Sequence, residues 1–198
     1  MKKFKLIVIS ILLALSFSIS AKPESECQVK PLSLMLNGNI PITKGLDDFY
    51  AALDSAGYDE HYWKSSRWGT VYGFEDCEIL VEEDDVSEDG EVSSVIVFLY
   101  DSFQDWESAI ALYEKVIDRI VAIEGTEDAL CNYSARKIED PNARKQAVAE
   151  KTSMYETYFR KGTYDTWFGI ITVKIVVYLD EYRVCIVYDP FFDGIKKK

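Results

Sequence analysis

The stretch VIVFLYDSFQDWESAIALYEKVIDRIVAIEG, residues 95–125, decides the fold because a strand pattern passes directly into a helix pattern. Residues 95–100 are apolar and rich in β-branched and aromatic side chains, which favours a β-strand. A helix is predicted from Ser102, the expected N-cap of an approximate capping box with Asp105, to a stop at Gly125. Its predicted inner face consists of Trp106, Ile110, Tyr113, Ile117 and Ile120. An amphipathic helix beside an apolar strand predicts an α+β fold.

The same order of helix and hairpin occurs twice along the chain. A helix predicted from an N-cap at Thr43 to Ala56 precedes a hairpin of residues 73–81 and 95–100. The helix after Ser102 precedes a hairpin of residues 175–177 and 184–188. Both hairpins end in a similar pattern, Tyr100-Asp101-Ser102-Phe103 and Tyr188-Asp189-Pro190-Phe191. We therefore expect two helix-plus-antiparallel-hairpin repeats, about 31–101 and 102–192, that share one sheet with the helices packed on one face.

Turn residues indicate the connections between these elements. Asp89-Gly90 is a hairpin turn signal, and Asp180-Glu181 is expected to form the tighter turn of the second half. Residues 126–151 are predicted to be a loop with a short helix over 143–150. Residues 58–72 show no clear period.

The N-terminus has the layout of a secretory signal peptide. Three lysines precede an apolar run, which closes on Ser20-Ala21, so we expect cleavage after residue 21 and a single mature domain of residues 22–198. The run is too short to span a bilayer, so no transmembrane segment is expected after cleavage. The expected location is the periplasm or the extracellular medium.

The net charge of the chain limits the kinds of partner that are expected. The net charge is −12, and removal of the basic signal peptide would make it −15. A surface this acidic repels nucleic acid and anionic lipid. The expected partner is another exported or envelope protein; the oligomeric state is left open.

Four cysteines, Cys27, Cys77, Cys131 and Cys185, would allow two disulfides in an exported chain, with three possible connectivities. Cys77 and Cys185 also lie in apolar runs, where buried free thiols are the alternative. The spacing contains no CxxC pair, which argues against a zinc site or a redox motif.

No motif for catalysis or cofactor binding is present, so neither a metal nor a cofactor is predicted and an enzyme is not the favoured class. His61 is the only histidine, and no nucleophile elbow, phosphate-binding loop or HExxH lies near it. The acidic run over residues 82–91 partly matches a calcium loop but has Ile96 at the position of the bidentate Glu, so a solvated hairpin loop is the better interpretation.

An aromatic cluster in residues 58–72 is the candidate binding surface. We expect the surface to consist of Tyr62, Trp63, Trp68 and Tyr72, joined by Asp84 and Asp85 for a basic partner. The alternative is that these aromatic residues cover one end of the core.

Asn39-Ile40-Pro41-Ile42-Thr43, the following Leu46-Asp47-Asp48-Phe49, and Ile186-Val187-Tyr188-Asp189 resemble a pattern in exported Bacteroidetes proteins of uncharacterised function. The resemblance covers nearly all of the mature chain, although Glu127 replaces a proline that is usual there. The duplicated plan is similar in architecture to β-lactamase-inhibitor-like proteins, an analogy that carries no function by itself.

These features together predict an exported, non-catalytic binding protein that acts through protein–protein contact. Two alternatives stay open: an exported hydrolase that uses acidic residues on glycans, and a structural component of the envelope.

Overall fold

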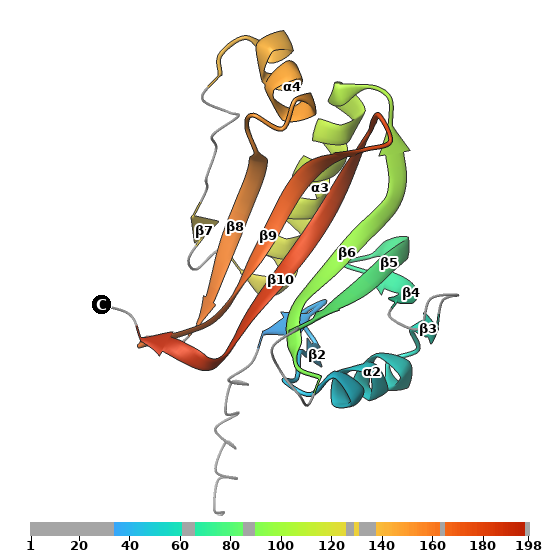
Figure 1. The fold of residues 1–198 in the computed structure, drawn as a ribbon, viewed down its shortest axis with the longest axis vertical. Helices are drawn as coiled ribbons and strands as arrows, with labels where there is room; N and C mark the ends of the chain where they lie inside the picture. Colours follow the sequence, from blue (N-terminus) through green and yellow to red (C-terminus); the bar gives the residue numbers. More distant parts are fainter. Residues whose placement is uncertain are drawn as a thin grey trace, which may run out of the picture. The chain divides into compact units, whose positions relative to one another are not determined.

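The computed structural model describes residues 34–60, 66–84, 90–125, 129–130, 138–162 and 165–196. Its main element is an eight-stranded antiparallel sheet in the order β3-β4-β5-β6-β10-β9-β8-β7 (Figure 1). The strands are β3 Asp59–Glu60, β4 Ser66–Val71, β5 Phe74–Glu83, β6 Val92–Phe103, β7 Ala129–Leu130, β8 Tyr155–Gly162, β9 Thr166–Tyr178 and β10 Glu181–Lys196. A small hairpin, β1 Met35–Leu36 with β2 Ile40–Pro41, lies outside this sheet. The helices are α2 Leu46–Ser55, α3 Trp106–Glu124 and α4 Pro141–Ala149, so the predicted α+β class is confirmed.

Pairing of β6 with β10 joins the two halves of the sheet. Val97 lies opposite Ile186, and Val95 lies opposite Tyr188. The two stretches whose endings the sequence analysis compared are therefore neighbours at the middle of the sheet.

Helix α3 packs on the β8–β9–β10 half of the sheet through aromatic side chains. The Trp106 ring lies 5.4 Å from that of Tyr155 and 5.3 Å from that of Tyr182, in edge-to-face geometry that aromatic pairs favour. The Tyr113 hydroxyl lies 2.6 Å from the Oγ1 atom of Thr157. The buried residues of this helix are Trp106, Ala109, Leu112, Tyr113, Val116 and Ile120. The predicted Ile110 and Ile117 are only partly buried against the core.

The prediction that Ser102 caps α3 is wrong. Strand β6 continues to Phe103, so Ser102 still lies in the sheet. Asp105 is the N-cap, and its Oδ1 atom accepts a hydrogen bond of 2.7 Å from the backbone N–H of Ser108. The carboxylate satisfies one of the free N–H groups in the first turn.

Helix α2 begins at Leu46, with Gly45 rather than Thr43 at the N-cap position and no side-chain cap. The Thr43 hydroxyl donates to the backbone oxygen of Gly45 instead, so the predicted cap at Thr43 is also wrong. Helix α2 packs on the sheet through Arg67 of β4, whose Nε atom lies 2.6 Å from Oδ1 of Asp54. The Arg67 guanidinium lies 4.6 Å from the centre of the Tyr50 ring.

Two tight turns between strands of the main sheet have both central residues in the left-handed region. Tyr72 (φ 52°) and Gly73 (φ 79°) join β4 to β5, and Leu179 (φ 50°) and Asp180 (φ 64°) join β9 to β10. Tyr178 pairs with Glu181, so the second turn lies one residue before the predicted Asp180-Glu181. Two positive φ values match the twist of a hairpin.

The sequence did not predict strands β4 and β8, whereas it did predict a short helix at α4. Proline at the start of α4 and the Asp140 cap, which accepts from Asn142 N–H at 2.9 Å, fix its N-terminus.

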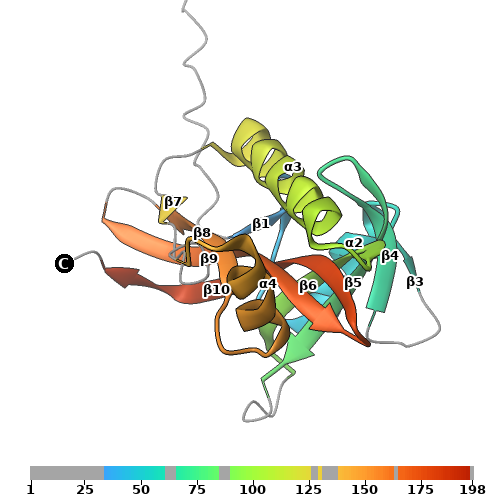
Figure 2. The same ribbon diagram turned by 90° about the horizontal axis from the view of Figure 1, so that it is seen from above.

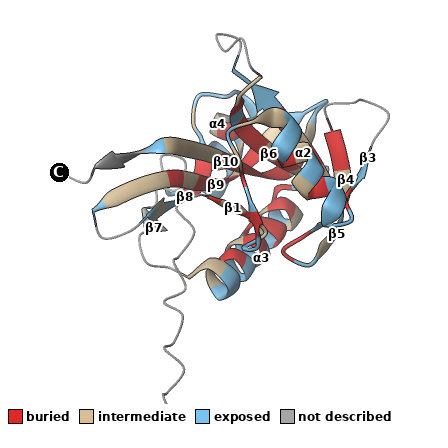
Figure 3. Ribbon diagram, turned by 90° about the horizontal axis from the view of Figure 1, so that it is seen from below, coloured by how far each residue is buried: buried red, intermediate tan, exposed pale blue. Residues whose placement is uncertain are grey.

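Alternation along the strands divides the sheet into two faces, which we name the helix face and the open face. The helix face carries fully buried residues such as Ile79, Val97 and Ile186 (Figure 3). The open face carries the intervening residues and includes Leu80, Ile96 and Val187. Figure 1 looks onto the open face, with α3 behind the sheet; among the described residues, no helix crosses in front of β6, β10 and β9.

Candidate functional site

A row of apolar side chains runs across the centre of the open face. The strand register aligns Leu80 of β5, Ile96 of β6 and Val187 of β10 as direct cross-strand neighbours. Thr172 of β9 and Tyr158 of β8 continue the row. Leu80, Ile96 and Tyr158 are half-buried, whereas Val187 and Thr172 between them are buried, at 8% exposure each, because cross-strand neighbours shield one another. Neighbouring apolar side chains on a solvent-facing surface are typical of an interaction site.

A second row beside it mixes aromatic and charged residues. Trp68 of β4, Glu78 of β5 and Phe98 of β6 are successive neighbours. Cys185, Lys174 and Glu156 continue this row on β10, β9 and β8. All of them are half-buried except Cys185 (1% exposed) and Glu156 (6% exposed), which are buried. The open face therefore offers both apolar area and polar groups that can orient a partner.

The most exposed aromatic residue of this face is Tyr100, at 68% exposure. Its ring centre lies 6.0 Å from that of Trp68, with the rings tilted by 60°. The sequence analysis placed Trp68 in a binding surface but missed Tyr100, which stands at the end of an apolar run. Aromatic residues with one exposed face are common in binding hot spots.

Beside Tyr100, strands β5 and β6 separate. Their paired register ends at Glu78 opposite Phe98, and β6 has an irregular register with β10 between Arg183 and Cys185. The separation forms a pocket of about 330 Å³, which we name the split. It is lined by Gly73, Phe74, Glu75, Asp76, Leu99, Tyr100 and Asp101.

Three of the residues that line the split carry carboxylates, and none is basic. Glu75, Asp76 and Asp101 are all exposed. Asp76 has a left-handed φ of 54°, a conformation that aspartate tolerates better than most residues do. On the helix side, Nζ of Lys115 lies 5.5 Å from the centre of the Phe74 ring. The split is therefore a negatively charged end of the open face.

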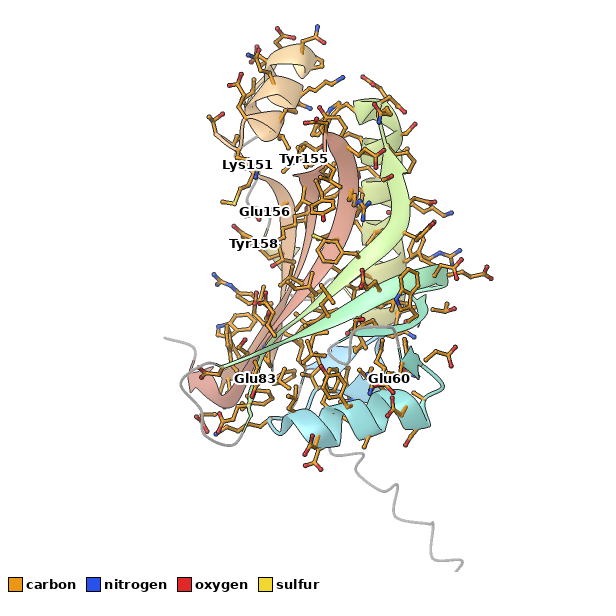
Figure 4. All side chains as sticks on the ribbon, turned by 45° about the vertical axis from the view of Figure 1, so that its right-hand side comes forward. Glu60, Glu83, Lys151, Tyr155, Glu156 and Tyr158 are labelled. Carbon is orange, nitrogen blue, oxygen red and sulfur yellow. The ribbon has the colours of Figure 1, made fainter. Side chains whose placement is uncertain are left out.

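The opposite half of the open face carries the positive charge. Lys174 of β9 and Arg183 of β10 point to this face by register, whereas β5 and β6 contain no lysine or arginine. Glu156 accepts a hydrogen bond of 3.1 Å from the hydroxyl of Tyr158. Figure 4 shows Lys151, Glu156 and Tyr158 together around the start of β8, while Glu60 and Glu83 lie toward α2. The basic residues of this face therefore lie on β9 and β10, while the charged residues of β5 and β6 are all acidic.

Cys77 and Cys185 are free buried thiols on opposite faces of the sheet. Cys77 belongs to the helix face with Ile79, and Cys185 lies opposite Phe98 on the open face. Side chains that point to opposite faces cannot form a disulfide, so a bond between these two cysteines is excluded. Burial raises the pKa of Cys77 to about 11 and that of Cys185 to about 12, which keeps both as thiols rather than nucleophilic thiolates at neutral pH. Cys27 and Cys131 lie outside the described residues.

A buried polar cluster lies under the C-terminus of α3. The Tyr72 hydroxyl donates to Oε1 of Glu124 at 2.7 Å, and the Glu124 carboxylate pairs with Nζ of Lys161 at 3.2 Å. Lys161 also donates to the backbone oxygen of Glu124 at 2.7 Å, which satisfies a carbonyl at the helix end. Burial raises the pKa of Tyr72 far above that of an exposed tyrosine. The cluster joins the β4–β5 turn, α3 and β8, and its described contacts are internal.

The predicted binding surface is only partly located by the structure. Tyr72 is 1% exposed and bonded within the core, so its place in an exposed surface is wrong; for this residue the alternative, coverage of one end of the core, is correct. Trp68 lies on the open face, and Asp84 is exposed at the end of β5. Tyr62, Trp63 and Asp85, with His61, lie outside the described residues, as do the signal peptide and residues 85–89 of the acidic run.

No arrangement suited to a metal ion is present in the described segments, where no three His, Cys, Asp or Glu side chains converge as ligands. Within the same segments, no helix is long and apolar enough to cross a membrane.

Comparison of the chain with protein-family models, with curated proteins and with solved structures found no match. The family resemblance noted in the sequence therefore stays a prediction.

Proposed function

We propose that this protein is an exported, non-catalytic binding protein that acts through protein–protein contact, and that the open face is its contact surface. The observation that carries the proposal is the apolar row of Leu80, Ile96 and Val187, which lies at the centre of a sheet face with no described helix in front of it. Trp68 and Tyr100 add aromatic area at its edge. Apolar and aromatic area surrounded by charged residues is the usual composition of a protein interface.

We also propose that the chain contains two repeats of one plan, with the helices packed on one face of the shared sheet. The strand order supports this, because β3-β4-β5-β6 and β7-β8-β9-β10 run in mirrored sequence to the central β6–β10 pair. In such an arrangement the two repeats form one continuous open face.

Site-specific photo-crosslinking in the protein's own cells tests the proposed contact surface. A photoreactive phenylalanine analogue replaces Phe98 or Tyr100 on the open face, or Ala111 or Asp118 on the exposed side of α3 as matched controls. We expect a discrete adduct of one molecular mass from both open-face positions and none from the helix positions.

Two results would contradict the proposal. Adducts of equal yield from the open-face and helix positions would show that the protein contacts its neighbours without a preferred surface. The absence of an adduct from both open-face positions would show that the open face is not a contact surface. Thermal unfolding of each variant establishes that it is folded before the comparison is made.

A further inference from the structure

We infer that the partner is a protein with a basic segment, and that a lysine or arginine side chain of this segment enters the split. This inference rests on the proposed function, because it names the chemistry of the partner that the open face would bind. The split is the pocket between the separated ends of β5 and β6, at one end of that face.

Charge complementarity is the first argument for this partner. Glu75, Asp76 and Asp101 line the split without a basic residue among the lining side chains. Glu78, in the row that leads from Trp68 to Phe98, adds a fourth carboxylate on the adjoining face. A cation entering the split would meet carboxylates contributed by both strands, an arrangement that favours charge-assisted hydrogen bonds.

The exposed ring of Tyr100 and the half-buried ring of Trp68 supply the second argument. Tyr100 both lines the split and contacts Trp68, so two rings stand beside the carboxylates. The face of a tyrosine or tryptophan ring attracts an ammonium or guanidinium group. Exposed rings next to carboxylates suit the long side chains of lysine and arginine, whose stems are apolar and whose ends are charged.

A basic partner fits better than a second copy of this chain. The chain carries a net charge of −12, so two copies repel each other at long range, whereas a basic protein is attracted. Strands β5 and β6 contain no lysine or arginine, and Lys174 lies on β9, two strands from β6, whereas Arg183 of β10 pairs with Ser102 of β6. We therefore place the basic segment of the partner on the β4–β5–β6 half of the face.

Binding of a small cationic probe tests this inference directly. Blocked tri-arginine and tri-glutamine peptides are titrated into the isotope-labelled protein, and amide chemical shifts are followed. We expect tri-arginine to shift the signals of residues 73–76 and 99–101, and tri-glutamine to leave them unchanged. Shifts centred elsewhere, or spread evenly over the acidic surface, would overturn the inference.

A matched pair of variants separates a specific site from general attraction. The variant D76N/Y100A/D101N removes two charges and the exposed ring of the split, and E107Q/D118N removes two charges from exposed positions on α3. We expect the first to weaken tri-arginine binding by about 10-fold and the second by less than about 2-fold. Equal losses would overturn the inference. All five substituted side chains are exposed, so both variants should fold, and thermal unfolding checks this.

The crosslinking experiment distinguishes failure of the inference from failure of the proposed function. If the Phe98 adduct keeps its yield in the D76N/Y100A/D101N background, the open face binds a partner without the split, and only the inference fails. If no open-face position forms an adduct, the proposed function fails whatever the peptide does. Sedimentation of the protein alone adds one further outcome: a dimer abolished by open-face substitutions would identify a second copy and overturn the basic partner.

Discussion

Among single residues, Tyr72 combines a left-handed backbone with complete burial. Its φ is 52°, its N–H donates to Oδ1 of Asn37 at 2.6 Å, and its hydroxyl donates to the Glu124 carboxylate. Tyr72→Phe leaves a buried carboxylate oxygen without this donor, so we expect the free energy of unfolding to fall by about 1–3 kcal/mol. Urea denaturation measures the change. Tyr100→Phe is the matched control, because Tyr100 is exposed; an equal loss in both variants would show that the Tyr72 hydroxyl contributes nothing specific.

The two buried thiols predict a decline in stability at alkaline pH. Burial raises the pKa of Cys77 to about 11 and of Cys185 to about 12, whereas an unfolded cysteine ionises near 8.5. Between those values the unfolded chain has lost the proton that the folded protein keeps, so stability is full below pH ~8.5 and falls as pH rises toward the folded pKa values. We expect the fall in unfolding free energy from pH ~9 to ~11 to be smaller in Cys185→Ala than in the wild type. Parallel curves for the two proteins would contradict this.

Among the elements, α3 has an N-terminus whose cap can be tested against the one that the sequence predicts. The hydrogen bond from the Ser108 N–H lowers the pKa of Asp105. Asp105→Ala should lower Tm by about 2–4 °C, the size expected for a lost cap, and Ser102→Ala should leave Tm almost unchanged. The effect of Asp105→Ala should shrink as pH falls below the ordinary pKa of aspartate, because a depressed pKa stabilises only while the group is ionised. A larger decrease in Tm for Ser102→Ala than for Asp105→Ala would instead support the capping box predicted from the sequence.

The helices and strands that the sequence predicted are those whose pattern of apolar residues is uninterrupted. Strands β5, β6, β9 and β10 contain the apolar runs, and α3 has a clear helical period. Strand β4 was missed because Arg67 occupies a buried position and is held there by Asp54 of α2, a partner distant in sequence. Strand β8 was missed because Glu156 occupies a buried position, where its carboxylate accepts a hydrogen bond from Tyr158, two residues along the same strand. A tertiary contact that satisfies a buried charge leaves no trace in local periodicity.

For the molecule as a whole, the candidate site depends on contacts between distant strands. The sequence analysis assigned Trp68 to a binding surface, but it missed Tyr100, which is 32 positions further along the chain. The two rings lie close together because β4, β5 and β6 are consecutive strands of the sheet. The split forms where the pairing of β5 with β6 ends, and no residue type in the sequence predicts where that pairing ends. Tyr72 was assigned to the surface because it belongs to an aromatic cluster in a segment with no clear period; the hydrogen bond to Glu124 of α3 instead holds it in the core.

The net charge of the whole chain gives stability and binding opposite responses to salt. With 34 acidic and 22 basic residues, the folded protein stores like-charge repulsion that added ions screen. Raising NaCl from about 20 mM to about 500 mM shortens the Debye length from roughly 20 Å to about 4 Å, so we expect Tm to rise. The same change should weaken tri-arginine binding at the split, because the attraction between the peptide and the carboxylates is screened too. Differential scanning calorimetry and the peptide titration, run on the same samples, measure both.

A Tm that falls with salt would mean that ion pairs such as Arg67–Asp54 and Lys161–Glu124 outweigh the repulsion. Peptide binding unchanged by salt would remove charge complementarity as the basis of recognition.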